Sequence, residues 1–253
     1  VSGTFGQFLF AHRGVNTEWL VAVRMLTAGV LMLGFVALRT PRDLFAIWTN
    51  RRDALRMVVF GLFGVLAVQY TYFAAINASN AATATVIQYT GPVLIVGWFA
   101  LQKKRWPTPF ELLCVGMAIA GTFFMVTHGS LTNLLISKMA LVWGLSSAVA
   151  LAFYSIQPLS LMHRYSPPVI IGWGMLIGGL ALSLVHAPWE IEGVWDTPAL
   201  GAFAFVIVFG TLIPFYAYLT AVKIVGAETS SLLACSEPLA AAVIGMIWLG
   251  THF

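Results

Sequence analysis

Charged side chains and cysteines are scarce in this sequence. Charged residues make up 9% of the 253 positions and hydrophobic residues 60%, whereas soluble domains contain roughly 25% charged residues. This composition excludes an ordinary soluble domain and indicates a protein that resides in a lipid bilayer. The two cysteines, Cys114 and Cys235, both lie in apolar segments. We expect them to be packing residues rather than a disulfide or a metal site.

The sequence also lacks the motifs of most enzymes and cofactor-binding proteins. It contains no HExxH, no Walker loop and no GxGxxG, and its five histidines lie in loops or at the ends of apolar segments. The run Gly144–Ser147 weakly resembles an intramembrane serine protease, but no histidine lies inside a predicted helix to act as its base. We therefore expect no metal, no cofactor and no enzymatic activity.

The net charge of +4 does not predict a nucleic-acid partner, because the basic residues are confined to short loops between apolar runs. The loops 39–56, 102–108, 159–167 and 222–229 hold ten of the thirteen Lys and Arg residues. They alternate with neutral or acidic loops such as 187–198. Basic loops of inner-membrane proteins face the cytoplasm, so the charge pattern predicts a multi-pass protein of the plasma (inner) membrane with these four loops on its cytoplasmic side.

What the sequence does contain is a series of long apolar runs. A spanning helix needs about 20 mostly apolar residues. Runs of this kind occur at 17–38, 57–76, 82–101, 109–127, 139–158, 168–186, 199–221 and 230–250, with a shorter one at 1–11. We expect nine helices in this sequence, the first of them truncated.

An internal repeat relates the two halves of the chain. The segment Tyr70–Ala75 aligns with Tyr216–Ala221 at an offset of 146, and the same offset aligns Pro92 with Pro238. A Phe-Gly pair that begins at Phe60 recurs at position 209, at a slightly larger offset. The proline in each half is expected to loosen its helix, because it removes a backbone donor.

The repeat unit holds five helices, so the second copy must enter the membrane from the opposite face. We therefore predict an all-α integral membrane protein of ten transmembrane helices in two inverted-topology repeats, residues 1–128 and 138–253. The tenth helix would lie beyond Phe253, and the given sequence is expected to be an excerpt of a longer chain.

Two stretches carry a resemblance to a known family. The arginine-containing LVAVRMLTAG in the second segment and SEPLAAAVIGMIWLG near the end, together with the repeat, resemble EamA-type members of the drug/metabolite transporter superfamily. The family often has an acid after its LG dipeptide, and this chain reads LGTHF and ALQKKRW instead. The resemblance implies a ten-helix secondary transporter with both termini cytoplasmic and a cavity between its halves. Such proteins often export amino acids or other small metabolites.

A polar stripe marks the segment 139–158. Trp143, Ser147, Tyr154 and Gln157 recur at helical spacing on one face, whereas the other faces are apolar. Polar groups that point at lipid are costly, so the stripe should face the bundle interior. We expect Trp143, Ser147 and Tyr154 to bind substrate, with the two aromatic residues as cavity walls. The alternative is interhelical hydrogen bonding alone.

Further candidate substrate-binding residues lie in the first half. Gln88 and Tyr89 share the segment of Pro92, and a glutamine amide is costly to leave in lipid. Gln69 and Tyr72 lie three residues apart on one face of the preceding segment, and Gln7 lies in the first. For the glutamines, a polar contact between helices is the alternative to a cavity role.

Arg24 and Glu237 are the two charged residues deep in apolar sequence, and an intramembrane charge indicates a functional site by default. Three hypotheses remain open. The two could form a structural ion pair. Glu237 could exchange a proton during transport or bind a substrate amine. Alternatively, Arg24 could extend to the surface while Glu237 is protonated and hydrogen-bonded.

These features predict a secondary transporter, and the resemblance implies that it is an exporter. It would move small amphipathic metabolites such as amino acids by alternating access. Its partners would be that substrate and the bilayer, with proton coupling through Glu237 and a monomer or weak homodimer as its assembly. A membrane enzyme acting on lipid-linked substrate and a channel are the alternatives. Saturable counterflow in proteoliposomes, non-saturating flux or product formation would distinguish them.

Overall fold

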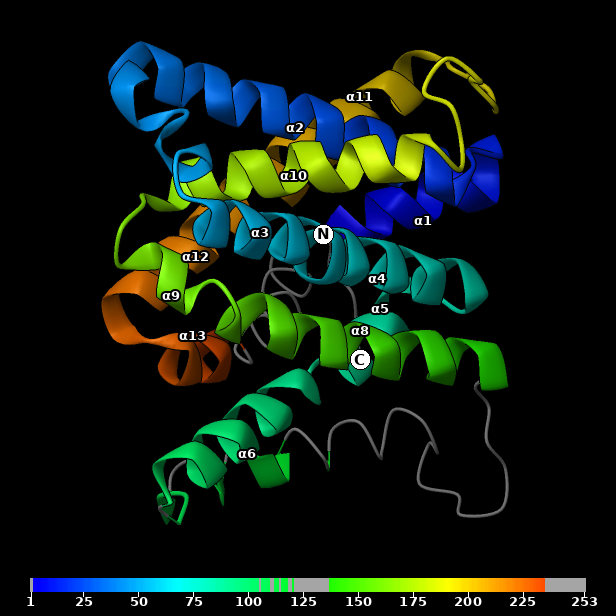
Figure 1. Cartoon of the computed structure of the whole chain (residues 1–253). Helices are drawn as coiled ribbons and strands as arrows, with labels where there is room; N and C mark the ends of the chain where they lie inside the picture. Colours follow the sequence, from blue (N-terminus) through cyan, green and yellow to red (C-terminus); the bar gives the residue numbers. More distant parts are fainter. Residues whose placement is uncertain are drawn as a thin grey trace, which may run out of the picture.

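The computed structural model describes residues 2–104 and 137–234, together with short pieces between 106 and 120. Within these ranges the chain is helical and contains no strand (Figure 1). The predicted segments 109–127 and 230–250 lie largely outside the described residues, as do Cys114, Cys235, Glu237 and Pro238.

The helices of the first half are α1 (Ser2–Arg13), α2 (Thr17–Arg39), α3 (Arg51–Val59), α4 (Ala67–Ala78), α5 (Ala81–Gln88) and α6 (Gly91–Lys103). Those of the second half are α8 (Lys138–Ile156), α9 (Leu159–Met162), α10 (Pro167–Ser183), α11 (Thr197–Ile207), α12 (Ile213–Val225) and α13 (Ala227–Ala234). Two short 3-10 turns, η1 (Pro41–Asp43) and η2 (Ala46–Trp48), lie in the loop after α2.

Side-chain caps fix where several of these helices begin. The Asn16 side chain accepts hydrogen bonds from the backbone amides of Glu18 and Trp19 at the start of α2. Asn80, Ser137 and Asp196 cap α5, α8 and α11 in the same way. The first amides of a helix have no partner within it, so each cap both satisfies a donor and ends the preceding loop at a defined residue.

Five helical stretches of the described residues are long and apolar enough to cross a membrane. They are Thr17–Arg39, Arg51–Ala78, Thr83–Lys103, Lys138–Met162 and Thr197–Val225. The shorter apolar helix α10 occupies the place of the predicted segment 168–186 but ends at Ser183. The sequence therefore located these spans correctly to within a few residues, except at the basic end of Arg51–Ala78, where α3 begins six residues before the predicted apolar run 57–76.

The span that contains Pro92 is interrupted, which goes beyond the loosening that the sequence predicts. α5 ends at Gln88 and α6 begins at Gly91, with Pro92 in its first turn. At the break the Ile87 carbonyl accepts from the Thr90 hydroxyl at 2.8 Å and from the Thr90 amide at 3.1 Å. The proline thus separates the span into two helices instead of merely loosening one.

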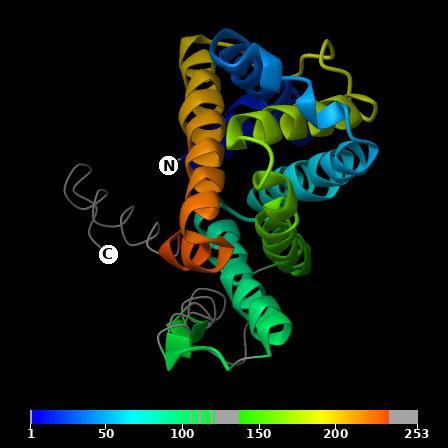
Figure 2. The same ribbon diagram turned by 60° about the vertical axis from the view of Figure 1, so that its left-hand side comes forward.

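A π-helical segment lies within one long span of each half. η3 (Phe60–Leu66) joins α3 to α4, and η4 (Val208–Leu212) joins α11 to α12. Each contains one of the two Phe-Gly pairs that the repeat aligns. Figure 2 shows α11, η4 and α12 as one continuous rod. π-Helical turns are rare and frequently lie at functional sites.

α2 and α10 form the most closely packed pair, and they lie side by side in Figure 1. Glycines make this approach possible. A Cβ atom at Gly29 would lie 3.1 Å from the Gly172 carbonyl oxygen, and one at Gly178 would lie 2.9 Å from the Gly61 carbonyl oxygen of η3. The Gly174–Gly178 pair is therefore a close helix contact, as its spacing predicts.

Two further packing relations cross between the halves. α1 packs against α11, and α8 packs against η3 and α4. The first helix of each half therefore contacts the third span of the other half.

The loops meet at two opposite ends of the molecule. At one end, Arg13 pairs with Asp196 at 2.8 Å, and the Trp19 indole donates to the Pro188 carbonyl at 2.9 Å. At the other end, the Asp53 carboxylate accepts from Arg164 and Tyr165, each at 3.0 Å. We refer to them as the Asp196 end and the Asp53 end.

The basic loops gather at the Asp53 end. Lys223 donates to the Tyr165 carbonyl at 3.3 Å, and Lys103 pairs with Glu228 at 3.0 Å. Burial, together with the hydrogen bond to Asp53, raises the pKa of the Tyr165 hydroxyl. Loops 39–56, 159–167 and 222–229 therefore share one face of the bundle.

Candidate functional site

A cavity of about 310 Å³ lies between the two halves of the described chain. Its walls come from α2, α4, α5, α8, α11, η4 and α12. The lining residues are Arg24, Val68, Gln69, Tyr72, Phe73, Thr85, Gln88, Leu151, Tyr154, Phe205, Phe209, Gly210, Pro214, Phe215 and Tyr218. Small-molecule pockets measure roughly 300–1,000 Å³ and combine apolar walls with a few polar groups, so this cavity suits a small metabolite.

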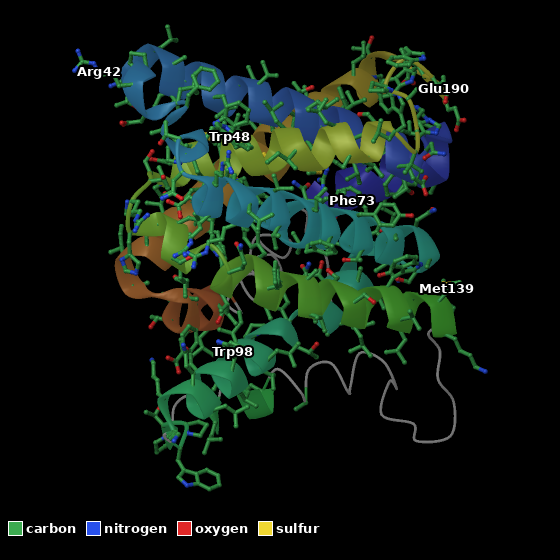
Figure 3. All side chains as sticks on the ribbon, viewed as in Figure 1. Arg42, Trp48, Phe73, Trp98, Met139 and Glu190 are labelled. Carbon is green, nitrogen blue, oxygen red and sulfur yellow. The ribbon has the colours of Figure 1, made fainter. Side chains whose placement is uncertain are left out.

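Arg24 is the charged residue of this cavity. It is only 2% exposed, and its guanidinium carbon lies 3.9 Å from the centre of the Phe73 ring on α4. Figure 3 labels Phe73 in the middle of the bundle. The described residues provide neither a hydrogen bond nor a carboxylate for Arg24, and its Nε is buried without an acceptor among them. The cation–π contact with Phe73 stabilises this charge.

Two neutral side chains of the cavity also have unmet hydrogen-bonding capacity. Gln69 is 2% exposed, and both its amide oxygen and its amide nitrogen lack a partner within the described residues. The Tyr154 hydroxyl on α8 is in the same situation. Buried polar groups are nearly always hydrogen-bonded, so these atoms point to water or a ligand as their partner.

An aromatic wall faces these polar groups. The Tyr154 ring lies 5.5 Å from Phe60, 5.4 Å from Phe215 and 5.9 Å from Tyr218. Further along, Phe205 and Phe209 stack at 5.0 Å. Aromatic pairs at 4.5–7 Å stabilise one another beyond simple burial, so the wall is a packed surface of fixed shape.

Three hydrogen bonds connect the polar residues around the cavity. The Gln88 amide donates to the Ser147 hydroxyl at 2.6 Å, which joins α5 to α8. The hydroxyls of Tyr72 and Thr85 share a hydrogen bond of 2.8 Å, as do those of Tyr218 and Ser155.

The structure brings together part of the predicted site. Gln69, Tyr72, Gln88 and Tyr154 line the cavity beside Arg24, and Ser147 reaches it through Gln88. These residues come from both halves of the chain, so the fold brings side chains that are up to 130 positions apart in sequence to one cavity.

Other predicted residues lie elsewhere. Trp143 does not line the central cavity. It lines a second pocket of about 340 Å³ at the Asp196 end, together with Glu18, Tyr70 and Asn77. Gln7 is outside the cavity as well, because its side-chain oxygen accepts from the Ala81 amide at 3.0 Å at the start of α5.

Tyr89 lies in the break between α5 and α6 and does not line the cavity. Glu237 lies outside the described residues. The expectation that Arg24 extends to the surface is wrong, because Arg24 is buried in the central cavity. The ion pair with Arg24 and the proton-exchanging or amine-binding role of Glu237 stay open.

Sequence reasoning missed the contribution of α11–α12. Phe205, Phe209, Phe215 and Tyr218 supply much of the aromatic wall. One signal was available, because the repeat aligns Tyr218 with Tyr72. The described residues contain no group of three or more His, Cys, Asp or Glu that could hold a metal ion.

Comparison with known proteins identifies the family. The model of the EamA-like transporter family matches residues 1–127 and again residues 138–253. The chain belongs to the EamA-like transporter family. It is thus a transporter of the drug/metabolite transporter superfamily, as the resemblance implied.

Relatives of this EamA transporter agree with the match. The uncharacterized inner membrane transporter YicL of Salmonella typhimurium is 36% identical over 252 residues, which cover 100% of this chain and 84% of YicL. The threonine/homoserine exporter RhtA of Escherichia coli is 26% identical over 239 residues, which cover 93% of this chain and 75% of RhtA. The EamA transporter is accordingly a multi-pass inner-membrane protein.

A solved crystal structure resembles the EamA transporter over its whole length. The match covers 100% of this chain and 87% of the other, with a TM-score of 0.70 and 17% sequence identity. At this identity the likeness concerns the fold alone.

Proposed function

We propose that the protein is a secondary transporter that exports small amphipathic metabolites such as amino acids, by alternating access around the central cavity. The observation that carries this proposal is the cavity itself, because helices of both halves supply its walls. Rocking of the halves against each other would expose such a site to one membrane face at a time. That RhtA is a threonine/homoserine exporter supports amino acids as the substrate class.

The architecture belongs to the same proposal. We infer ten helices in two inverted five-helix repeats, 1–128 and 138–253. The separate family matches to each half support it. The exchanged contacts support it too, since α1 packs on α11 while α8 packs on α4, and α2 packs on α10. A two-fold relation between the halves generates such reciprocal pairs.

We further propose that the Asp53 end and both termini are cytoplasmic. Cysteine labelling tests this orientation in a chain with Cys114 and Cys235 replaced by alanine. Arg42 and Glu190 are exposed and lie at opposite ends in Figure 3. A membrane-impermeant maleimide should label Glu190→Cys in intact spheroplasts and Arg42→Cys only after lysis. The reverse pattern would contradict the orientation.

Transport is tested by counterflow into proteoliposomes that contain the full chain. Radiolabelled amino acids and amines are each offered against unlabelled internal substrate. Saturable counterflow is expected. Non-saturating flux would instead indicate a channel, and a chemically altered solute would indicate an enzyme.

Proton coupling through Glu237 also remains a proposal. Glu237→Gln removes the titrating group while keeping a similar shape. If the acid exchanges a proton, transport driven by a pH gradient should fall strongly while folded yield stays normal. Full transport at normal yield would exclude this role.

A further inference from the structure

The cavity carries one positive charge and no compensating negative charge among its described lining residues. Arg24 is that charge, and the other lining side chains are neutral. A buried guanidinium loses its hydration and is costly unless it is paired. An apolar side chain at position 24 would fill the same space in the centre of the bundle without this unfavourable burial of a charge. Arg24 is therefore placed for something that the described chain does not itself provide.

The geometry leaves the hydrogen-bonding edge of Arg24 available. The guanidinium carbon of Arg24 lies 3.9 Å from the centre of the Phe73 ring. An aromatic ring supplies no oxygen acceptor to the five N–H donors of the guanidinium, and Nε has no acceptor among the described residues. Such a fork matches the two oxygens of a carboxylate. Gln69, 2% exposed and without a partner on either amide atom within the described residues, lines the same cavity.

Arg24 and Gln69 form a polar side of the cavity, and the aromatic wall forms an apolar side. Tyr154, Phe215 and Tyr218 pack as a continuous surface within the cavity. A ligand that satisfies both sides has an anionic group at one end and an apolar body at the other. One cation matches one carboxylate, so multiply charged anions would leave charge unpaired.

We propose that Arg24 and Gln69 bind the carboxylate of the transported molecule, and that the apolar side chain of this molecule packs against the aromatic wall around Tyr154. The substrate class is a small monocarboxylate, including zwitterionic amino acids. This inference rests on the proposed function, namely that the central cavity is the transport site. It adds that the carboxylate is the required group, since Arg24 is the charged side chain among the described lining residues.

Ligand series test the proposal on the wild-type chain in nanodiscs, by calorimetric titration. One series is phenylalanine, 3-phenylpropionate, phenylalaninamide and phenethylamine, and a second carries the leucine side chain through the same four forms. Both acids of each series should bind, and the amide and amine should not. Equal binding of the amines or amides, or no binding by any member of either series, would overturn the proposal.

Variants of Arg24 assign the effect to this residue. Hydrogen bonds to a charged group are stronger than neutral ones, so Arg24→Gln should weaken binding of the acids roughly 10- to 100-fold. Arg24→Lys keeps the charge without the planar fork and should bind with intermediate affinity. The matched control is Arg39→Gln, because Arg39 lies at the exposed end of the same helix over Phe35. It should bind like the wild type.

Unliganded stability separates ligand binding from a structural ion pair. Arg24→Gln removes an uncompensated charge, so its melting temperature without ligand should equal or exceed that of the wild type. A fall that the double variant Arg24→Gln/Glu237→Gln reverses would show that Arg24 pairs with Glu237 and would overturn the proposal. If Arg24→Gln does not fold at all, the wild-type ligand series still decides.

Failure of this inference differs from failure of the proposed function. Saturable counterflow of amines, with no response to carboxylates, would keep the transporter and overturn the role of Arg24. Binding of the acids without counterflow of any solute would keep the site and overturn transport.

Discussion

The polar residues of the cavity fall into two groups according to their hydrogen bonds. Gln88 is paired with Ser147, and Tyr72 with Thr85, so these side chains connect helices within the protein. Gln69 and the Tyr154 hydroxyl have no such partner within the described residues. The first group is suited to holding the walls of the cavity in place, and the second to meeting what enters it.

The Gln88–Ser147 contact predicts a modest effect on stability. Ser147 is fully buried, so Ser147→Ala leaves the Gln88 amide without this acceptor. Polar contacts between membrane helices contribute about 0.6 kcal/mol on average and up to about 1.7 kcal/mol. Ser147→Ala should lower the unfolding free energy within that range. A double-mutant cycle with Gln88→Leu in detergent measures the coupling.

Ser146→Ala is the matched control, because Ser146 directly precedes Ser147 in α8 and is half-buried. Its effect should be near zero and independent of Gln88. A coupling energy of zero between Gln88 and Ser147 would show that the contact contributes nothing to stability.

At the scale of elements, glycine contacts determine how closely α2, α10 and η3 pack. Because Gly61, Gly174 and Gly178 meet backbone to backbone or backbone to side chain, these helices approach more closely than larger residues allow. Membrane helices gain little from hydrophobic burial against one another, so close packing is a main source of their association.

Gly178→Ala should destabilise the protein. The added methyl group would lie 2.9 Å from the Gly61 carbonyl oxygen and would also meet the Met25 side chain. Inserting a methyl group into a packed interior costs typically about 1–3 kcal/mol. The unfolding free energy in detergent measures this cost.

Gly34→Ala is the control on α2, since an added Cβ there has no neighbour within 4 Å. It should be neutral or slightly stabilising, because alanine is the better helix former. If both variants lose equal stability, the contact with Gly61 is not the cause.

The sequence predicted the spans and the helix break well, because both depend on local properties. About 20 apolar residues define a span, and the missing amide of Pro92 interrupts one. Depth was harder to predict. Trp143 and Tyr154 share a helical face but lie eleven positions apart, or roughly 16 Å along the axis. One therefore lines the pocket at the Asp196 end and the other the central cavity.

Tertiary partners explain the remaining differences. Gln7 serves as an acceptor for the start of α5, and no local pattern in 1–11 indicates a contact with residue 81. The phenylalanines of α11 could not be assigned from composition, since cavity-facing and lipid-facing aromatic residues have the same chemistry. The predicted roles of the site residues remain predictions.

At the scale of the whole molecule, ion pairs connect distant parts of the chain at both ends. Arg13 and Asp196 are 183 positions apart, and Asp53 and Arg164 are 111 apart. The Asp196 carboxylate also accepts from the Ala199 amide as the cap of α11. The hydrogen bond from Arg13, followed by that from Ala199, lowers the pKa of Asp196 from its ordinary value of 3.8.

This pair predicts an acid dependence of stability. A carboxyl group whose pKa is lowered by folding stabilises the folded state at pH values above its unfolded-state pKa. This contribution is lost as the pH falls through the folded-state pKa. Asp196→Asn keeps a capping side chain but removes the charge. The wild type should therefore melt higher than Asp196→Asn above about pH 5, and the difference should shrink below pH 3.8.

Melting temperatures of the two proteins across pH 3 to 8 would be compared at constant ionic strength. Lys138→Gln, an exposed position at the same end, serves as the control and should show no pH-dependent difference. A constant difference between wild type and Asp196→Asn at every pH would contradict the assignment.

Each π-helical segment determines how the helix after it is rotated, about the span axis, relative to the helix before it. Each accommodates extra residues relative to an α-helix, in which successive side chains are about 100° apart. Deleting one residue from η3, for instance the exposed Phe63, would let the segment revert to α-helix. The faces of α3 and α4 would then rotate relative to each other, and either Gln69 would leave the cavity or Met57 would leave the core. The length of the chain between Phe60 and Leu66 therefore determines which residues of α4 face the cavity.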